Sequence, residues 1–222
     1  MLKEVERAAA PFDDLPASHF GIICADPPWT FLTRSDKGKG RSPEKHYGCM
    51  SLDDIKALPV KSLAAPDCVL FLWVTDPLLD VGVDVLKAWG FTFKTVGLTW
   101  AKLQKNETRP YWNEDSFFTG MGYWSRANTE PCLLGTIGSP KRLGRGVKRL
   151  VIAPRREHSR KPDESFARMR RLVPGPAVEL FSRENRPGWS TWGNEQGKWN
   201  DEPVSVSKPD LGPVQFQMFS EV

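Results

Sequence analysis

Short apolar runs alternate with polar segments along most of the chain, and several of the runs stop at proline or glycine. The run at 19–25 (HFGIICA) ends at two prolines, and the run at 68–74 (CVLFLWV) is almost uninterrupted. Apolar runs of this length are typical of strands that are buried on both faces of a sheet. The same reasoning predicts further strands at 91–101, 131–137, 150–153, 177–181 and, as a short piece, 189–192.

Helical patterns fill several of the intervals between these strands. Ser51 followed by Asp54 is a capping box that begins a helix. A second helix repeats apolar residues at helical spacing and stops at Gly90, and a third begins at Pro162, whose ring suits a first helical turn. The predicted helices run from 51 to about 58, from about 77 to 89 and from 162 to about 172.

Strands that alternate with helices predict an α/β fold with a parallel or mostly parallel sheet. The 222 residues suit one sizeable domain, and we assign residues 1–196 to it. Residues 197–222 carry several prolines and no clear pattern, so we expect an extended or partly ordered C-terminal extension. Ligands of such sheets bind at the carboxyl ends of strands, which singles out the strands before Asp26 and before Arg183.

The composition excludes several classes of protein. Hydrophobic residues make up 40% of the chain, no stretch of about 18 apolar residues is present, and the first residues lack the apolar segment of a secretory signal. We therefore expect a cytoplasmic protein without membrane contact. The four cysteines and three histidines show no zinc-ligand spacing, so we expect buried or free thiols and no metal site.

Positive charge is concentrated in one part of the sequence. Residues 141–171 hold twelve Lys and Arg against three Asp and Glu, a local net charge of +9, whereas the whole chain carries +4. A basic segment of this kind suits phosphate binding, although charge alone is explained equally well by a solvated basic face. Nine tryptophans, several in predicted loops, favour nucleic acid because aromatic faces stack on unpaired bases.

The tetrapeptide Asp26-Pro27-Pro28-Trp29 follows a predicted buried strand and has the groups needed to act on an amine. The exocyclic amine of adenine is a poor nucleophile, because its lone pair is delocalised into the ring. The Asp26 carboxylate and the Pro27 carbonyl can accept hydrogen bonds from its two hydrogens, and Trp29 offers a flat face for an extruded base. The alternative is a strand-ending turn that Asp26 caps.

Around this tetrapeptide the sequence resembles the adenine-N6 methyltransferases typified by the catalytic subunit of the eukaryotic messenger-RNA adenine methyltransferase, a family with many bacterial and phage members. The resemblance extends from about residue 20 to residue 196, and it is specific because several blocks occur in the family's order and spacing. The blocks are ADPPW at 25–29, HYGCMSLDDI at 46–55, FLWVT at 71–75, TEPCLLG at 129–135, HSRKPDE at 158–164, VELFSR at 178–183 and GWSTWGNE at 188–195.

The resemblance implies a Rossmann-like fold of S-adenosylmethionine-dependent methyltransferases with a permuted motif order, in which the catalytic motif precedes the cofactor strand. It also implies S-adenosylmethionine as the cofactor. Lys161 suits the methionine carboxylate, and Asn194 and Glu195 suit ribose hydroxyls. By this resemblance the catalytic and substrate-side residues are Asp26, Pro27, Pro28, Trp29 and Tyr47, and the cofactor-side residues are Asp26, Ser159, Lys161, Phe181, Arg183, Asn194 and Glu195.

Two departures from the family pattern are visible. The block that precedes the catalytic strand and contacts the adenine of the cofactor is missing, and Phe12 and Asp13 are the nearest candidates to replace it. The last block ends in Asn194-Glu195, where members often have Asn-Gln, so the second side chain accepts hydrogen bonds but offers no amide donor.

Three arginines precede or adjoin the predicted cofactor lysine. Arg155, Arg156 and Arg160 have a solvent-facing interpretation, but their closeness to the cofactor block favours contacts with substrate phosphates. We therefore interpret Arg155 and Arg156 as substrate-binding residues.

The segment 102–129 is polar and aromatic with little periodicity, which is typical of a functional loop. Its Trp112, Tyr123 and Trp124 suit local packing or dimer contacts better than base stacking. A homodimer or a paralogous partner subunit would fit this segment.

From these features we predict an enzyme that methylates N6 of adenine in DNA and comes from a bacterium or phage. DNA is preferred because the chain is short and lacks the extra regions of eukaryotic RNA-modifying relatives. The same reaction on RNA is the first alternative. A non-catalytic nucleic-acid-binding partner subunit is the second, and the intact tetrapeptide disfavours it. Neither a GxGxxG motif nor a P-loop is present, which disfavours other nucleotide-binding enzymes.

Overall fold

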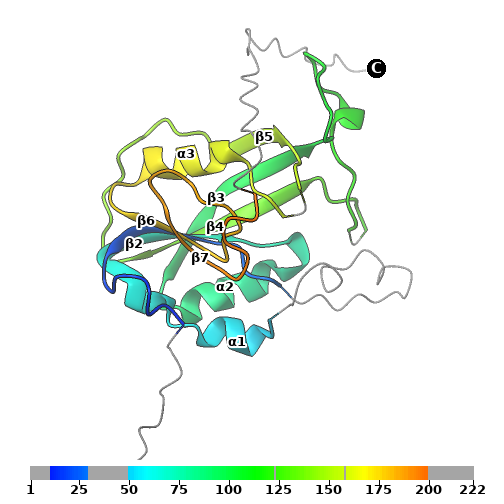
Figure 1. Cartoon of the computed structure of the whole chain (residues 1–222). Coiled ribbons are helices and arrows are strands. Elements are labelled where there is room, and N and C mark those ends of the chain that lie inside the picture. Colours follow the sequence, from blue (N-terminus) through cyan, green and yellow to red (C-terminus); the bar gives the residue numbers. More distant parts are fainter. Residues whose placement is uncertain (1–10, 30–49, 123, 158, 200–222) are drawn as a thin grey trace, which may run out of the picture.

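A sheet of seven strands forms the centre of the molecule (Figure 1). The structure is a computed structural model, and it describes residues 11–29, 50–122, 124–157 and 159–199. The order of the strands across the sheet is β5-β3-β4-β2-β1-β6-β7. The strands are β1 (Phe20–Ala25), β2 (Ala64–Trp73), β3 (Thr92–Leu103), β4 (Thr129–Ile137), β5 (Leu150–Pro154), β6 (Ala177–Leu180) and β7 (Ser190–Trp192).

Six of these strands run in one direction, and β4 runs against them. β1 pairs in parallel with β2 and β6, β3 pairs in parallel with β5, and β6 with β7, whereas β4 is antiparallel to both β2 and β3. The prediction of a mostly parallel sheet is confirmed. β4 is the exception because an irregular loop, and not a crossover helix, joins it to β3, so it returns beside β3 in the opposite direction.

The three predicted helices are all present. The start of the first is confirmed, because the Ser51 hydroxyl oxygen accepts the Asp54 backbone N–H at 3.1 Å. The second begins two residues later than predicted, since a 3-10 turn precedes it, and Pro162 is the N-cap of the third rather than part of its first turn. The helices are α1 (Leu52–Ala57), α2 (Leu79–Ala88) and α3 (Asp163–Leu172), and 3-10 helices lie at Val60–Leu63, Asp76–Leu78 and Glu114–Ser116.

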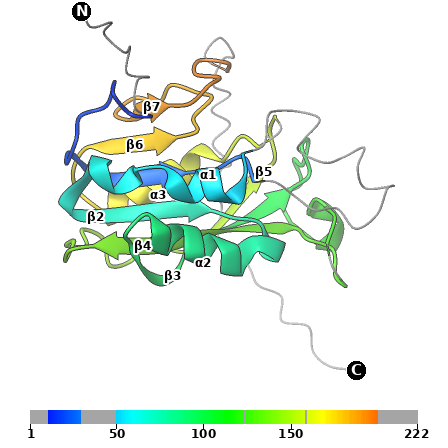
Figure 2. The ribbon, with the colours of Figure 1, turned by 90° about the horizontal axis from the view of Figure 1, so that it is seen from below.

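The helices cover the two faces of the sheet in separate layers, with α1 and α2 on one face and α3 on the other (Figures 1 and 2). Alternate residues of β2 point into these layers. Leu70 and Leu72 belong to the core cluster under α1 and α2, whereas Phe71 and Trp73 belong to the cluster that includes Phe166 of α3. Both faces of β2 are therefore buried, which explains its unbroken apolar run.

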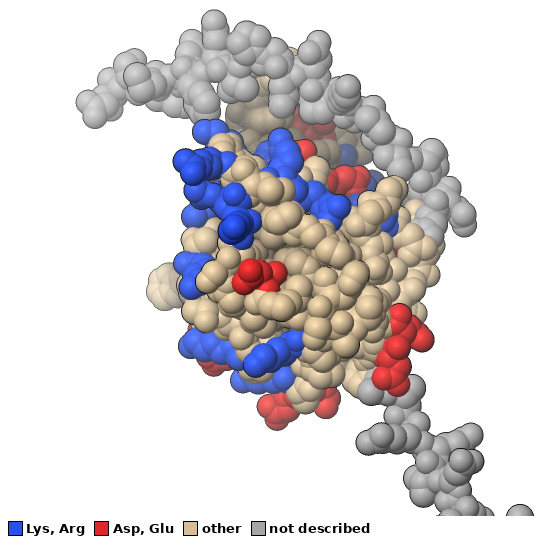
Figure 3. All heavy atoms as spheres, turned by 90° about the vertical axis from the view of Figure 1, so that its left-hand side faces the viewer, with Lys and Arg blue, Asp and Glu red and all other residues tan. Residues whose placement is uncertain are grey.

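The chain connections make the end of β1 a switch point in the strand order. β1 lies between β2 and β6, and the chain reaches these two neighbours through helices on opposite faces of the sheet. A crevice forms at such a point, outside the carboxyl ends of the strands. β1 and β2 begin on the left-hand side of Figure 1, the side that Figure 3 faces, and Asp26 follows β1 at the opposite end.

The cysteines that the structure describes are buried free thiols, as predicted. They are Cys24, Cys68 and Cys132, while Cys49 lies outside the described residues. Burial raises the pKa of the Cys68 thiol to about 12, so this group stays protonated. Among the described residues, no group of three or more His, Cys, Asp or Glu is placed to hold a metal ion. A search of the same residues finds no helix with the length and apolar character that a membrane crossing requires.

Candidate active site

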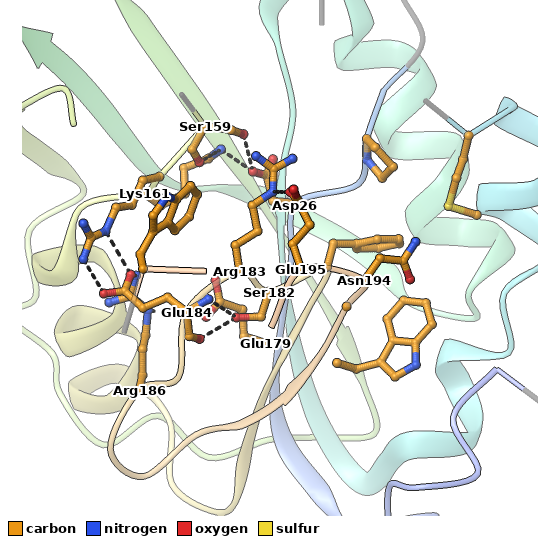
Figure 4. Close-up of a pocket in the computed structure, with 17 residues that line it drawn as sticks. Asp26, Ser159, Lys161, Glu179, Ser182, Arg183, Glu184, Arg186, Asn194 and Glu195 are labelled. Carbon is orange, nitrogen blue, oxygen red and sulfur yellow. Dashed lines mark hydrogen bonds and ion pairs between the residues drawn. The ribbon is translucent and has the colours of Figure 1, made fainter. Parts of the chain in front are cut away.

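Asp26, the residue that follows β1, lines a cavity of about 290 Å³ at the carboxyl edge of the sheet. Its side chain is 23% exposed, so it is neither sealed in the core nor on the open surface. Figure 4 shows that side chains from distant parts of the sequence face the same space. All seven residues predicted on the cofactor side line this cavity: Asp26, Ser159, Lys161, Phe181, Arg183, Asn194 and Glu195.

The two hydrogen-bond donors to the Asp26 carboxylate both bind the same oxygen. The Ser159 hydroxyl donates to Oδ2 at 3.0 Å, and the Lys161 ammonium donates to Oδ2 as well (Figure 4). Within the described part of the chain, Oδ1 therefore has no protein donor. Burial raises the pKa of Asp26 above its ordinary value, and this rise is opposed by Lys161. The geometry leaves one carboxylate oxygen available for a donor group of a ligand.

Lys161 belongs to a chain of alternating charges that continues below the cavity. Its ammonium lies 3.0 Å from a carboxylate oxygen of Glu130, and the other Glu130 oxygen lies 2.6 Å from the ammonium of Lys102. Burial alone would lower the pKa of Lys161, but the carboxylates of Asp26 and Glu130 raise it above its ordinary value. Burial alone would raise the pKa of Glu130, yet Lys161 and Lys102 hold it at about 2. Lys161 is therefore a fixed, buried cation.

The two other groups predicted to bind the substrate are held by the protein itself. The Pro27 carbonyl accepts the Trp29 backbone N–H at 2.8 Å, which leaves it one lone pair for a further donor. The Trp29 indole is buried in the core, and its N–H donates to the Trp73 carbonyl at 3.1 Å. This contact fastens the turn after β1 to the end of β2. Pro28 lines the cavity in addition to Asp26, and the stacking role of Trp29 stays a prediction.

Aromatic rings form the opposite wall of the cavity. Phe181, directly after β6, packs edge to face against Trp192 with ring centroids 5.4 Å apart, and Phe12 packs against the same indole at 4.8 Å. Phe12 is thus buried behind this wall, while Asp13 is exposed. This part of the cavity offers an apolar face for a flat ring.

Polar groups rim the aromatic wall. The Arg183 guanidinium is 3.0 Å from a Glu195 oxygen, so Glu195 is held in place although it lacks an amide donor. Asn194 also lines the cavity, and the Trp199 ring lies near the Arg160 and Arg183 guanidinium groups, at 5.5 and 5.7 Å. These amide, carboxylate and guanidinium groups suit hydroxyl and ring-nitrogen partners.

Two residues of the cavity have strained backbones. Ser159 has φ 69 and Phe181 has φ 62, in the left-handed region that residues with a side chain seldom adopt. Both line the cavity from loops that follow strands of the sheet, Ser159 after β5 and Phe181 after β6. Each such conformation costs on the order of 1 kcal/mol and persists only where the surroundings fix it, as at binding sites.

Gly193 brings two backbone segments of the cavity wall close together. A Cβ at this position would lie 2.5 Å from the Ser182 carbonyl oxygen and 2.8 Å from the Ser182 nitrogen, which donates to the Trp192 carbonyl at 2.9 Å. We expect Gly193→Ala to lower the free energy of unfolding by about 1–3 kcal/mol, because backbone cannot move aside as a side chain can. Urea denaturation measures this. Gly146→Ala, which meets nothing within 4 Å, should change little, and equal effects of the two substitutions would contradict the explanation.

Sequence reasoning missed a carboxylate on the floor of the cavity. Glu179 of β6 has a side chain that is 13% exposed, and its Oε2 makes no hydrogen bond although the Arg186 Nε lies 3.3 Å away. Burial raises the pKa of Glu179 to about 7, the Asp26 and Glu184 carboxylates add to the rise, and Arg186 opposes it. The signal was an acidic residue inside an otherwise apolar strand, in the block VELFSR.

Replacing this carboxyl by an amide should stabilise the protein at high pH. Between pH 4.5, the ordinary pKa, and about 7, the folded protein keeps a proton on Glu179 that the unfolded chain releases. The contribution of Glu179 to stability is therefore most favourable below pH 4.5 and is lost as the pH rises through about 7. At ~1.4 kcal/mol per pKa unit, Glu179→Gln should gain on the order of 2–3 kcal/mol at pH 8.

Urea unfolding of the wild type and of Glu179→Gln at pH 5 and pH 8 tests this expectation. The difference between the two proteins should grow with pH. Glu114→Gln, which changes an exposed carboxyl, is the matched control and should leave the pH profile unchanged. A gain that is the same at both pH values would show that the carboxyl is not protonated in the folded state.

The predicted phosphate-binding arginines lie in three different environments. Arg155 is exposed, and its guanidinium stacks over the Phe118 ring at 3.7 Å. Arg156 donates to the Asp163 carboxylate at 3.0 Å and to the Lys161 carbonyl, so its described contacts are with protein. Arg160 is buried and pairs with two carboxylates. The geometry favours a phosphate contact for Arg155 over Arg156, and both roles stay predictions.

Several predicted residues are not placed at the cavity. Tyr47 lies outside the described residues, as does Tyr123 of the long loop. Trp112 is partly exposed and Trp124 is fully exposed, with φ 65. Neither ring lines the cavity, so base stacking and dimer contact both remain open for the exposed aromatics.

Comparison with known proteins gives a family and a set of relatives. The family model MT-A70 matches residues 20–195. The N(6)-adenosine-methyltransferase MT-A70-like protein of Drosophila melanogaster is 35% identical over 203 residues, which cover 89% of this chain and 29% of the relative. The type II methyltransferase M.MunI of Mycoplasma sp is 30% identical over 203 residues, covering 83% of this chain and 81% of the relative.

A human adenosine methyltransferase is similar to this chain as well. The N(6)-adenosine-methyltransferase catalytic subunit METTL3 of Homo sapiens is 31% identical over 181 residues, covering 79% of this chain and 28% of the relative. The chain thus spans 29% and 28% of the length of these two adenosine methyltransferases, but most of the length of the type II methyltransferase.

Proposed function

The chain belongs to the MT-A70 family, a methyltransferase family with DNA and RNA members, and on this basis we propose that it transfers a methyl group from S-adenosylmethionine to the N6 amine of adenine in DNA. The observation that carries the proposal is the Asp26 carboxylate at the cavity, with one oxygen held by Ser159 and Lys161 and the other without a protein donor among the described residues. The α/β fold of the described residues agrees with this family, and the permuted motif order stays a prediction.

The cavity fits S-adenosylmethionine by the chemistry of its lining. The aromatic wall of Phe181 and Trp192 suits the adenine ring, and Asn194 with the Arg183–Glu195 pair suits the ribose hydroxyls. At the other end, the positive charge of Lys161 suits the carboxylate of the methionine part. When bound, S-adenosylmethionine supplies a methyl group activated by its sulfonium.

The residues of this chain then position the target amine and accept its proton. Asp26 Oδ1 and the free lone pair of the Pro27 carbonyl hold the two hydrogens of the target amine, which keeps the nitrogen lone pair aimed at the methyl carbon. S-adenosylmethionine would supply the methyl carbon of the new N–C bond, and its sulfur would keep the electron pair of the C–S bond. The methylated amine is left with one extra proton, for which the Asp26 carboxylate, whose pKa is raised by burial, is the nearest acceptor.

The edge of the sheet around the cavity suits a nucleic acid. The β3–β4 loop leaves this edge with exposed Tyr111, Trp124 and Arg126, and Arg155 stands beside it on the Phe118 ring. Cations interleaved with aromatic rings bind phosphates and unpaired bases. The same exposed rings would serve a homodimer or a paralogous partner subunit, which stays a second possibility for this loop.

DNA is the preferred substrate because M.MunI, a relative of which this chain covers 81% of the length, is a type II methyltransferase. The adenosine methyltransferases match over a smaller share of their length. A bacterial or phage origin and a cytoplasmic location follow the same preference and stay predictions.

Incorporation of tritiated methyl groups into random-sequence DNA and RNA of equal length tests the proposal. We expect N6-methyldeoxyadenosine as the labelled nucleoside after digestion of the DNA. Label in RNA alone would favour the RNA alternative. Cofactor binding in calorimetry without label in either polymer would favour a non-catalytic partner subunit.

A further inference from the structure

The basic segment of the sequence divides into two groups that lie at opposite edges of the sheet. β4 ends at Ile137, which pairs with Cys68 of β2 at the level where β1 begins, so the loop that follows β4 leaves the sheet at the far edge. α3 begins at Asp163 and ends at Leu172, beside Leu143 of that loop. The cations of the far edge are defined here as the far-edge patch: Lys141, Arg142, Arg145, Lys148, Arg149, Arg168, Arg170 and Arg171.

This patch has little compensating charge. Glu164 pairs with Arg168 and Arg171, at 2.8 and 2.9 Å. Four other members, Lys141, Arg142, Arg145 and Lys148, are exposed and have no ion pair or side-chain hydrogen bond with another described residue. Figure 3 looks onto this edge, and Lys and Arg side chains gather on its upper left.

The loop that carries the free cations is anchored to the protein. The Leu143 backbone N–H donates to the Leu172 carbonyl at 2.9 Å, at the end of α3. The Arg168 guanidinium donates to the carbonyls of Lys148 and Leu150, and so fastens the other end of the loop. Cations on an anchored backbone are already arranged before a ligand arrives, which lowers the entropy lost on binding.

We propose that the far-edge patch is a second contact surface for nucleic acid, which binds the phosphate backbone of DNA outside the target site. The inference rests on the proposed function for the polymer that it binds. Lys and Arg side chains without carboxylate partners suit phosphates, and a surface that meets only the backbone gives affinity and retention without reading sequence.

The separation of the two surfaces predicts a dependence on DNA length. β1 holds six residues, so at ~3.3 Å per residue its two ends, and with them the two edges, are roughly 20 Å apart. DNA rises 3.4 Å per base pair, so a site with only a few flanking nucleotides fills the cavity without reaching the patch. Longer DNA that bends around the protein, or a second DNA segment, would reach both.

Fluorescence anisotropy measures the affinity for a 40-base-pair duplex. With no cofactor in the assay, it tests the far-edge patch without requiring catalysis. The triple variant Lys141→Glu, Arg145→Glu, Lys148→Glu should lose at least ~10-fold in affinity, and the salt dependence of binding, as log K against log salt, should become shallower by roughly three. Binding of a 5-nucleotide strand with the target adenine at its centre, and methyl transfer to it at saturation, should be unchanged.

The matched control reverses three cations on the α1 and α2 layer: Lys56→Glu, Lys61→Glu and Lys87→Glu. It changes net charge by the same amount and should retain most of the affinity. Equal losses in both variants, or no loss in the far-edge variant, would overturn the proposal. A far-edge effect in a protein that transfers no methyl group would uphold this surface and count against the proposed reaction, so the two failures are distinguishable.

Discussion

Asp26→Asn should reduce methyl transfer by at least ~1,000-fold while the protein stays folded. The amide is neutral, whereas the carboxylate that it replaces would offer the target amine a negatively charged acceptor. In one of its two orientations the amide would also point its own N–H groups at the N–H groups of that amine. Folding should survive because Lys161 keeps its partner Glu130 at 3.0 Å. Single-turnover transfer of tritiated methyl to saturating DNA measures the chemical step apart from binding.

Three further measurements separate catalysis from other causes of this loss. Cofactor affinity by calorimetry shows whether the variant still fills the cavity, and urea unfolding shows whether it is folded. Glu114→Gln, an exposed carboxyl-to-amide change remote from the cavity lining, should retain full activity. A folded, cofactor-bound Asp26→Asn protein with more than a tenth of the wild-type rate would remove Asp26 from the reaction.

The catalytic strand and its turn were predictable because their signals are local. A strand that is buried on both faces is an apolar run without polar interruptions, and two successive prolines end it. The position of Asp26 at the end of such a strand therefore follows from a few neighbouring residues. The block order added Ser159, Lys161 and Asn194, all of which line the cavity. Their roles toward a cofactor stay predictions.

Other features depend on pairings between distant residues, which a local pattern does not contain. Glu130 and Lys102 meet because β4 returns antiparallel beside β3, and nothing in either strand alone predicts the ion pair at 2.6 Å. The hydrogen bond from the Trp29 indole N–H to the Trp73 carbonyl joins residues 44 positions apart, so the tetrapeptide alone does not predict it. The basic segment is continuous in sequence, yet its first part leaves the sheet after β4 at the edge opposite Asp26, where the Leu143 backbone N–H meets the Leu172 carbonyl.

Lys161→Met should lower the free energy of unfolding by about 3–5 kcal/mol at pH 8 and abolish methyl transfer. It removes the cation between two buried carboxylates and leaves Asp26 and Glu130 close together, with only Lys102 near the second. Both carboxyls then favour their neutral forms, so their folded pKa values rise above the unfolded ones. Stability lost by this route is largest at high pH and is recovered in part as the pH falls toward 4.

Lys161→Arg and the double variant Lys161→Met, Glu130→Gln isolate the charge from the shape of the side chain. The arginine keeps a cation between the carboxylates and should retain most of the stability, although its planar fork should weaken cofactor binding. The double variant removes the Glu130 charge from beside Asp26 and should be more stable than Lys161→Met alone, by about 1–3 kcal/mol in urea unfolding. If Lys161→Met and Lys161→Arg unfold at the same urea concentration, the charge of Lys161 does not hold the two carboxylates. Asp26 would then owe its position to Ser159 and the proline turn alone.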